Sequence, residues 1–226
     1  MQFKVVGEPM PVAIVSLSQG ETIVTESGAM SWMSDNIQME TKGGGVGKML
    51  GRAFSGESLF LNRYTAQGPN QEIALASCLP GCIRPYEITP NKSIIVQKGG
   101  FLAAEATVEL SIHYKKKLGA SLFGGEGIIM QKISGNGTAL IEIDGYAIDY
   151  DLIAGQKLIV DTGYVVVMDE TCTMDVVTVP GVKNMLFGGE GIFNTVITGP
   201  GRVTVQTMPV SSLAGTIIPF LPRPTK

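Results

Sequence analysis

Hydrophobic and polar residues alternate along most of this chain, as they do in β-strands that bury one face. In the segment FLAAEATVELSIHY, every second residue from Leu102 to Ile112 is alanine or a larger aliphatic residue. The same period returns in VVVMDETCTMDVV and breaks only at Glu170. A helical period occurs only in one-turn pieces such as VGKMLGRAF. The pattern therefore predicts an all-β protein.

The pattern also recurs three times along the chain. Leu17, Ile88 and Leu152 each stand eleven residues before a glycine, and an aliphatic pair follows each of them six residues on. The offsets between equivalent landmarks are 71, 69 and 67 residues for the first step and 64 residues for the second. Such a constant offset indicates a triplicated unit. The three glycines are Gly28, Gly99 and Gly163.

A phenylalanine opens a related glycine-rich motif in each copy. FSGESLF begins at Phe54, FGGEGII at Phe123 and FGGEGIF at Phe187, and a turn followed by a strand comes after each. We therefore divide one compact body, residues 1–226, into three repeats and a tail. The predicted ranges are 11–80, 82–146 and 146–210 for the repeats and 211–226 for the C-terminal tail.

A unit of this size, with about six short strands, exposes strand edges and an apolar face. Three such units can cover one another's edges by packing around an axis. We therefore expect three tandem β modules with pseudo-threefold symmetry.

The triple pattern, with its FSGES and FGGEG motifs and its TGPGRV ending, resembles the altered-inheritance-of-mitochondria protein twenty-four family, long regarded as a domain of unknown function. The resemblance runs through nearly the whole chain. It implies a tryptophan-attenuation-protein-like (TRAP-like) fold, built of β-sandwich or short double-stranded β-helix units. Bacterial and archaeal members are mostly uncharacterised, and the eukaryotic relatives are mitochondrial and linked to inner-membrane organisation. The family supplies no established catalytic residue for this chain.

Composition narrows the functional classes. The net charge of −3 gives no bulk attraction to nucleic acid or to anionic lipid. One histidine and three cysteines leave too few soft ligands for a zinc site, and we expect reduced thiols rather than a Cys78–Cys82 disulfide. The N-terminal segment has no signal-peptide pattern, so we expect a cytoplasmic protein. No cofactor motif is present, since neither GxxxxGK[ST] nor GxGxxG occurs.

The glycine-rich motifs have two interpretations. In the first, their glycines form tight turns or allow close backbone approach, and the glutamates accept backbone hydrogen bonds. In the second, a threefold arrangement brings the three glutamates together as a cation site. The turn glycines are Gly56, Gly124, Gly125, Gly188 and Gly189, and the candidate metal-binding glutamates are Glu57, Glu126 and Glu190.

Three other segments are candidates for binding. HYKKK, residues 113–117, is a basic patch, interpreted as a solvated strand end rather than a nucleic-acid site. TKGGGVGKML, residues 41–50, is a candidate anion-binding backbone nest. Trp32 is expected in the core or in an interface.

The tail after residue 210 contains a bunched apolar group, Ile217 to Leu221. Its prolines, among them Pro219, predict a poor helix. It docks either on its own domain or on a partner or membrane surface.

We expect a non-enzymatic, homo-oligomeric scaffold or interaction protein, possibly membrane-peripheral in its location. The alternative is a small-molecule or nucleic-acid binding module that uses grooves between repeats. An enzyme ranks third, because no constellation of base, nucleophile or metal ligands emerges.

Overall fold

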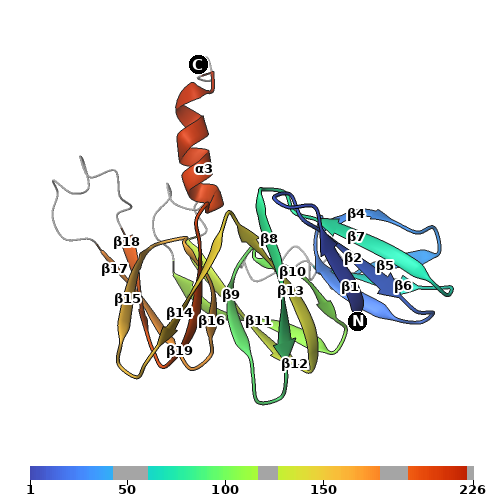
Figure 1. Ribbon diagram of the computed structural model, residues 1–226, viewed down its shortest axis with the longest axis horizontal. Coiled ribbons are helices and arrows are strands. Elements are labelled where there is room, and N and C mark those ends of the chain that lie inside the picture. The colour runs from blue at the N-terminus through green and yellow to red at the C-terminus, as the bar shows by residue number, and fades with distance from the viewer. Residues whose placement is uncertain (43–60, 117–126, 179–192, 223–226) are drawn as a thin grey trace, which may run out of the picture.

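The computed structural model describes residues 1–42, 61–116, 127–178 and 193–222 of the chain. Antiparallel strands make up nearly all of the described residues, and a single short α-helix projects from them (Figure 1). The all-β class predicted from the sequence is confirmed.

The first group of strands follows an N-terminal strand, β1, that pairs with β2. Within this group, which we call strand set one, β7 lies between β2 and β4, while β6 lies between β5 and β3. The strands are β1 (Gln2–Val6), β2 (Val12–Leu17), β3 (Thr22–Glu26), β4 (Met30–Met33), β5 (Ile37–Lys42), β6 (Leu61–Ala66) and β7 (Gln71–Ala76).

Strand set two repeats this pairing. β13 lies between β8 and β10, while β12 lies between β11 and β9. Its strands are β8 (Gly81–Ile88), β9 (Ile94–Gln97), β10 (Phe101–Glu105), β11 (Val108–Lys116), β12 (Ile128–Gly135) and β13 (Gly137–Asp144).

Strand set three repeats it again, with β19 between β14 and β16 and β18 between β15 and β17. Its strands are β14 (Ala147–Leu152), β15 (Lys157–Asp161), β16 (Val165–Asp169), β17 (Thr173–Thr178), β18 (Phe193–Thr198) and β19 (Gly201–Gln206).

The turn glycines found by sequence occupy the same place in each set. Gly28, Gly99 and Gly163 follow β3, β9 and β15, and all three have φ values near +90° to +106°. Only glycine adopts this conformation at little cost, which explains why it recurs at one position of each set.

Neighbouring sets are joined by continuous sheets. β3 of set one pairs with β10 of set two, and β9 of set two pairs with β16 of set three, both antiparallel. We call these two strand pairs the joints. Among the described strands no pair links set three back to set one, and the sets lie in a row (Figure 1). The strand pairing therefore does not show the closure around a pseudo-threefold axis that we expected, and the repeat boundaries stay a prediction.

The core runs through the joints without interruption. The cluster centred on set one includes Leu102 and Leu140 of set two, and the next cluster includes Val166 and Val167 of set three. Alternation along the strands produces this core, since inward residues of adjacent sheets meet.

The tail forms a helix, contrary to the prediction. α3 spans Val210–Ile217 and continues into a single 3-10 turn, η2 (Ile218–Phe220). Pro209 stands at the N-cap and Pro219 lies in the 3-10 turn, so both prolines lie outside α3. A proline at either end of a helix removes no internal hydrogen bond, and this explains the wrong prediction.

Candidate functional site

The residues of the predicted glutamate site and its turn glycines lie outside the described residues, as does most of TKGGGVGKML. The basic patch is described up to Lys116 and forms the end of β11, with His113 and Lys115 exposed, as expected of a solvated strand end. Cys78 and Cys82 are free thiols.

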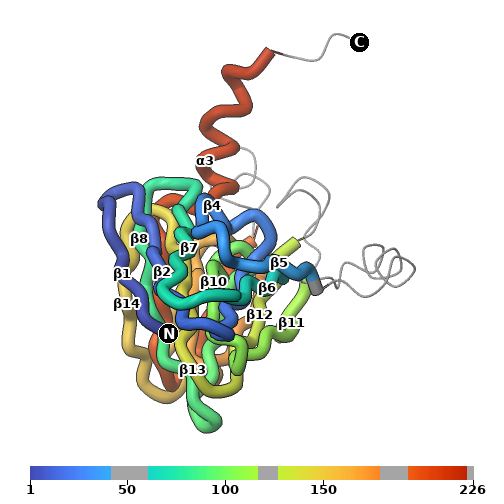
Figure 2. The backbone as a smooth tube through the Cα atoms, turned by 90° about the vertical axis from the view of Figure 1, so that its right-hand side faces the viewer, coloured from blue at the N-terminus to red at the C-terminus, as the bar shows by residue number. Residues whose placement is uncertain are grey.

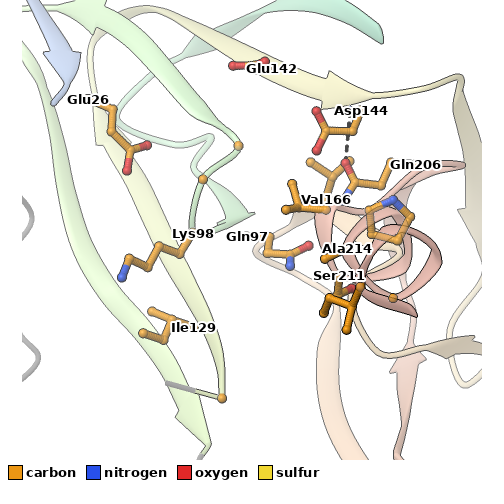
Figure 3. Close-up of a pocket in the computed structure, with 17 residues that line it drawn as sticks. Glu26, Gln97, Lys98, Ile129, Glu142, Asp144, Val166, Gln206, Ser211 and Ala214 are labelled. Atoms are coloured by element: carbon orange, nitrogen blue, oxygen red, sulfur yellow. Dashed lines mark hydrogen bonds between the residues drawn. The ribbon is translucent and has the colours of Figure 1, made fainter. Parts of the chain in front are cut away.

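A groove opens where the base of α3 stands over sets two and three. It has a volume of about 710 Å³, and an adjoining hollow of about 460 Å³ lies along the same helix. Figure 3 shows Glu26, Glu142 and Asp144 around one side and residues of α3 on the other. Residues that line both hollows are Gly99, Glu142, Asp144, Val210 and Ala214.

Burial perturbs the acids of this groove. It raises the pKa of Asp144 to about 6, and the nearby Glu142 carboxylate adds to the effect. Burial also raises the pKa of Glu142, although the backbone N–H of Cys78 donates to its Oε1 at 3.1 Å and opposes the rise. The pKa of Glu26 is raised by burial, and Lys98 partly offsets this. The groove is therefore acidic and incompletely neutralised near pH 7.

Gln206 fixes one wall of the groove. Its Oε1 accepts from the backbone N–H of Asp144 at 3.1 Å, and its Nε2 donates to the carbonyl oxygen of Gly163 at 2.9 Å. The buried amide thus connects the last strand of set two to the turn after β15. Because Gln206 is followed closely by α3, the same bonds position the base of the helix.

The chemistry that this groove supports is limited. Within the described ranges, no group of three or more His, Cys, Asp or Glu side chains could hold a metal ion. Three carboxylates beside apolar α3 residues instead form a surface suited to a small organic cation. An acidic lining is unfavourable to the phosphates of nucleic acid.

The sequence did not identify the groove because its acids come from different strand sets. Asp144 was examined with other aspartates and showed no recognisable spacing. One signal was available: Glu26, Gln97 and Asp161 each stand two residues before a turn glycine, and the first two line the groove.

The two ends of the row expose apolar side chains. On β4, at one end, Trp32 is 55% exposed and Met33 is also exposed, so Trp32 is not a core residue. On β15, at the other end, Ile159 is 65% exposed. Figure 1 shows these two strands at opposite ends of the molecule.

α3 and η2 form a further exposed feature. No residue of either helix is buried, so the docking of the tail on its own domain is confined to the loose contact at the groove. Figures 1 and 2 both show α3 projecting from the strands. In the described part of the chain, no helix has the length and apolar character that crossing a bilayer requires.

Comparison with known proteins gives one family and two similar proteins. The model of the family described as Mitochondrial biogenesis AIM24 matches residues 3–208. An uncharacterised protein of Streptococcus pyogenes serotype M6 is 28% identical over 221 residues, which cover 94% of this chain and 87% of that protein. A crystal structure of a Streptococcus pyogenes protein superposes with a TM-score of 0.81 at 24% identity, covering 97% of this chain and 99% of that one. The second likeness supports the fold alone.

Proposed function

The chain belongs to the Mitochondrial biogenesis AIM24 family, and from that premise we propose that it is a non-enzymatic scaffold that attaches peripherally to a membrane surface through α3 and η2. The observation that carries this proposal is a projecting helix with no buried residue. A helix normally gains its stability by packing an apolar face, so an unpacked apolar helix suggests an external binding surface.

The exposed tip of the helix is apolar and uncharged. No acidic or basic residue occurs from Met208 to Pro222. Phe220 is 86% exposed, and Ile218 and Leu221 are exposed as well. A cluster without charge can enter the boundary between lipid headgroups and acyl chains without burying an ion.

Charge favours an anionic lipid surface over a neutral one. The chain as a whole has a net charge of −3, yet the stretch from Thr207 onward contains Arg223 and Lys226 and no acid. Basic residues beside an apolar insertion add electrostatic attraction to anionic headgroups. The eight residues of α3 are far short of the roughly 20 that span a bilayer, which is why we propose peripheral attachment.

Vesicle flotation tests this proposal. The full chain is mixed with phosphatidylcholine vesicles that either contain or lack phosphatidylglycerol. We expect flotation with the anionic vesicles, strong reduction by Ile218→Ser with Phe220→Ser, and lower salt resistance for Arg223→Glu with Lys226→Glu.

The matched control is Ile153→Ser, which removes an equally exposed aliphatic side chain near the end of β14 remote from α3. We expect it to float like the unmodified chain. Failure of the unmodified chain to float with either vesicle would refute membrane attachment, as would equal flotation of the tip variant and the control.

A second candidate function is binding of a small organic cation in the groove. The three raised-pKa carboxylates favour it, and they disfavour the nucleic-acid alternative. Native mass spectrometry of protein from its own source would reveal a retained ligand, and Asp144→Asn should release it. Absence of both a ligand and an enzyme-like constellation would leave the scaffold with a cytoplasmic location as the remaining proposal.

A further inference from the structure

We propose that copies of this chain assemble head to tail, with the outer edge of β15 pairing antiparallel with the outer edge of β4 in the next copy. Within the described strands, β15 has only β18 beside it and β4 has only β7. The counterparts of both strands in the other sets lie between two neighbours. This inference stands on strand pairing and is independent of the role proposed for α3.

The two internal joints show what such a contact looks like. At the first joint Thr25 faces Ala103 and Val24 faces Ala104. At the second joint, Val96 faces Val167 and Ile95 faces Met168. Moving along the chain by the repeat offsets of 71 and 64 residues converts the first pairing into the second. The same joint has therefore been built twice from different side chains.

Backbone irregularities support this alignment of the sets. β4, β10 and β16 each show a shift of register against their inner neighbour. The shift falls between Met30 and Trp32 in β4, and at the equivalent positions in β10 and β16. A bulge that recurs at one position is a conserved part of the architecture of the sets. Trp32 is thus the counterpart of Ala103 and Val167.

The offsets then predict the register of the contact between copies. Trp32 of one copy should face Val160 of the next, and Met33 should face Ile159. Both pairs follow from Ala103 facing Thr25 and Ala104 facing Val24 when the first strand is moved back and the second moved forward by the repeat offsets.

Burial distinguishes the paired positions from the unpaired ones. Val24 and Ile95 are buried at the joints, whereas Ile159 at the equivalent position is 65% exposed. Ala103 is likewise buried, whereas Trp32 is 55% exposed. Side chains that form core at two joints are therefore exposed at the two ends, and a third joint between copies would bury them.

A second contact at the joint points the same way. Tyr86 of set two places its hydroxyl 3.4 Å from Oγ1 of Thr204 in set three. Its counterpart 64 residues on is Tyr150, which is exposed beside the free end of set three. The next copy would supply the missing neighbour.

The composition of the two edges favours pairing over protection. Isolated edge strands usually carry prolines or central charges that prevent association. β4, with the sequence MSWM, has neither, and β15 keeps its charges at its ends, in Lys157 and Asp161. Other outer strands do carry them, for example Pro85 in β8 and Asp149 in β14.

The opposite placement of the two edges determines the kind of assembly. Because β4 and β15 lie at opposite ends of the row (Figure 1), a second copy is the available occupant. A contact between two different surfaces is heterologous, so it forms a closed ring if its rotation closes and a filament if it does not.

Cross-linking tests the register. Met33→Cys and Ile159→Cys are made in separate chains whose exposed Cys78 and half-buried Cys82 are replaced by serine. Directly opposite antiparallel residues have Cα atoms about 4.5–5.5 Å apart, within the range of a disulfide. We expect a cross-linked dimer on oxidation of the mixture. The offset control, Met33→Cys with Lys157→Cys, should cross-link at least tenfold less.

Native mass spectrometry and sedimentation test the assembly itself. We expect the unmodified chain to form oligomers and Ile159→Asp to reduce them to single chains, with circular dichroism and the melting cooperativity retained. Single chains at every concentration of the unmodified protein would overturn the proposal. Equal cross-linking of matched and offset pairs, or an Ile159→Asp oligomer of unchanged mass, would overturn it too.

Discussion

The backbone N–H of Asp144 donates to Oε1 of Gln206 at 3.1 Å, and this bond connects strand set two to set three beside the base of α3. Gln206 is buried and its Nε2 donates to the carbonyl oxygen of Gly163, so one amide satisfies backbone groups of two different sets. A buried amide in this position stabilises the joint and also shapes the groove.

We predict that Gln206→Ala lowers the free energy of unfolding by about 2–4 kcal/mol, because a backbone donor and a backbone acceptor lose their partner. Urea denaturation measures the change. Gln67→Ala is the control, since its side chain donates to Thr65 at the surface, and it should cost less than about 0.5 kcal/mol. Equal costs for the two variants would contradict the role given to Gln206.

The raised pKa of Asp144 predicts a pH-dependent stability. A carboxyl whose pKa is raised to about 6 in the folded state binds its proton more tightly there than in the unfolded chain. Its stabilising effect is therefore complete below the unfolded pKa, near 3.8, and is lost as the pH rises through about 6.

Asp144→Asn should thus raise the melting temperature at pH 7.5 and have a smaller effect at pH 4.5, where Asp144 is already protonated. Melting curves at both pH values measure this. Asp35→Asn, a change at an exposed residue outside the groove, should show no such difference. A gain for Asp144→Asn that is the same at both pH values would contradict the assigned ionisation.

The strand β8 begins at a glycine that has no room for a side chain. A Cβ at Gly81 would lie 2.0 Å from the carbonyl oxygen of Ile143, a backbone atom of the paired strand β13. We predict that Gly81→Ala costs about 3 kcal/mol or more, because one of the two strands must shift. Gly20→Ala is the control: nothing lies within 4 Å of its Cβ, and only its positive φ should cost about 1 kcal/mol.

The sequence predicted the local architecture well and the site poorly, for a physical reason. Alternation and turn glycines act within a few residues, so strands such as β10 and turns such as that at Gly99 could be derived from them. Glu26 and Glu142 meet only because β3 and β13 flank β10 in one sheet. Pairing between sets is a long-range outcome, and no local pattern specifies it.

The helix α3 illustrates the opposite error. Prolines in the tail predicted a break, but their positions outside Val210–Ile217 leave the helix intact. The count of prolines was less informative than their location relative to an eight-residue segment.

Ile95 and Ile159 provide the last prediction, because they are equivalent residues in different surroundings. Ile95 is fully buried at a joint, so Ile95→Ala should cost about 2–5 kcal/mol at any protein concentration. Ile159→Ala removes an exposed side chain from the single chain and should cost less than about 0.5 kcal/mol in dilute solution. If copies pair through β15, however, the unmodified protein gains stability as its concentration rises, since association stabilises the folded state by mass action. The Ile159→Ala variant should gain less, so the difference in melting temperature between it and the unmodified protein should widen with concentration. Melting curves over a dilution series measure this, and a difference that stays constant would show that Ile159 is not in the contact between copies.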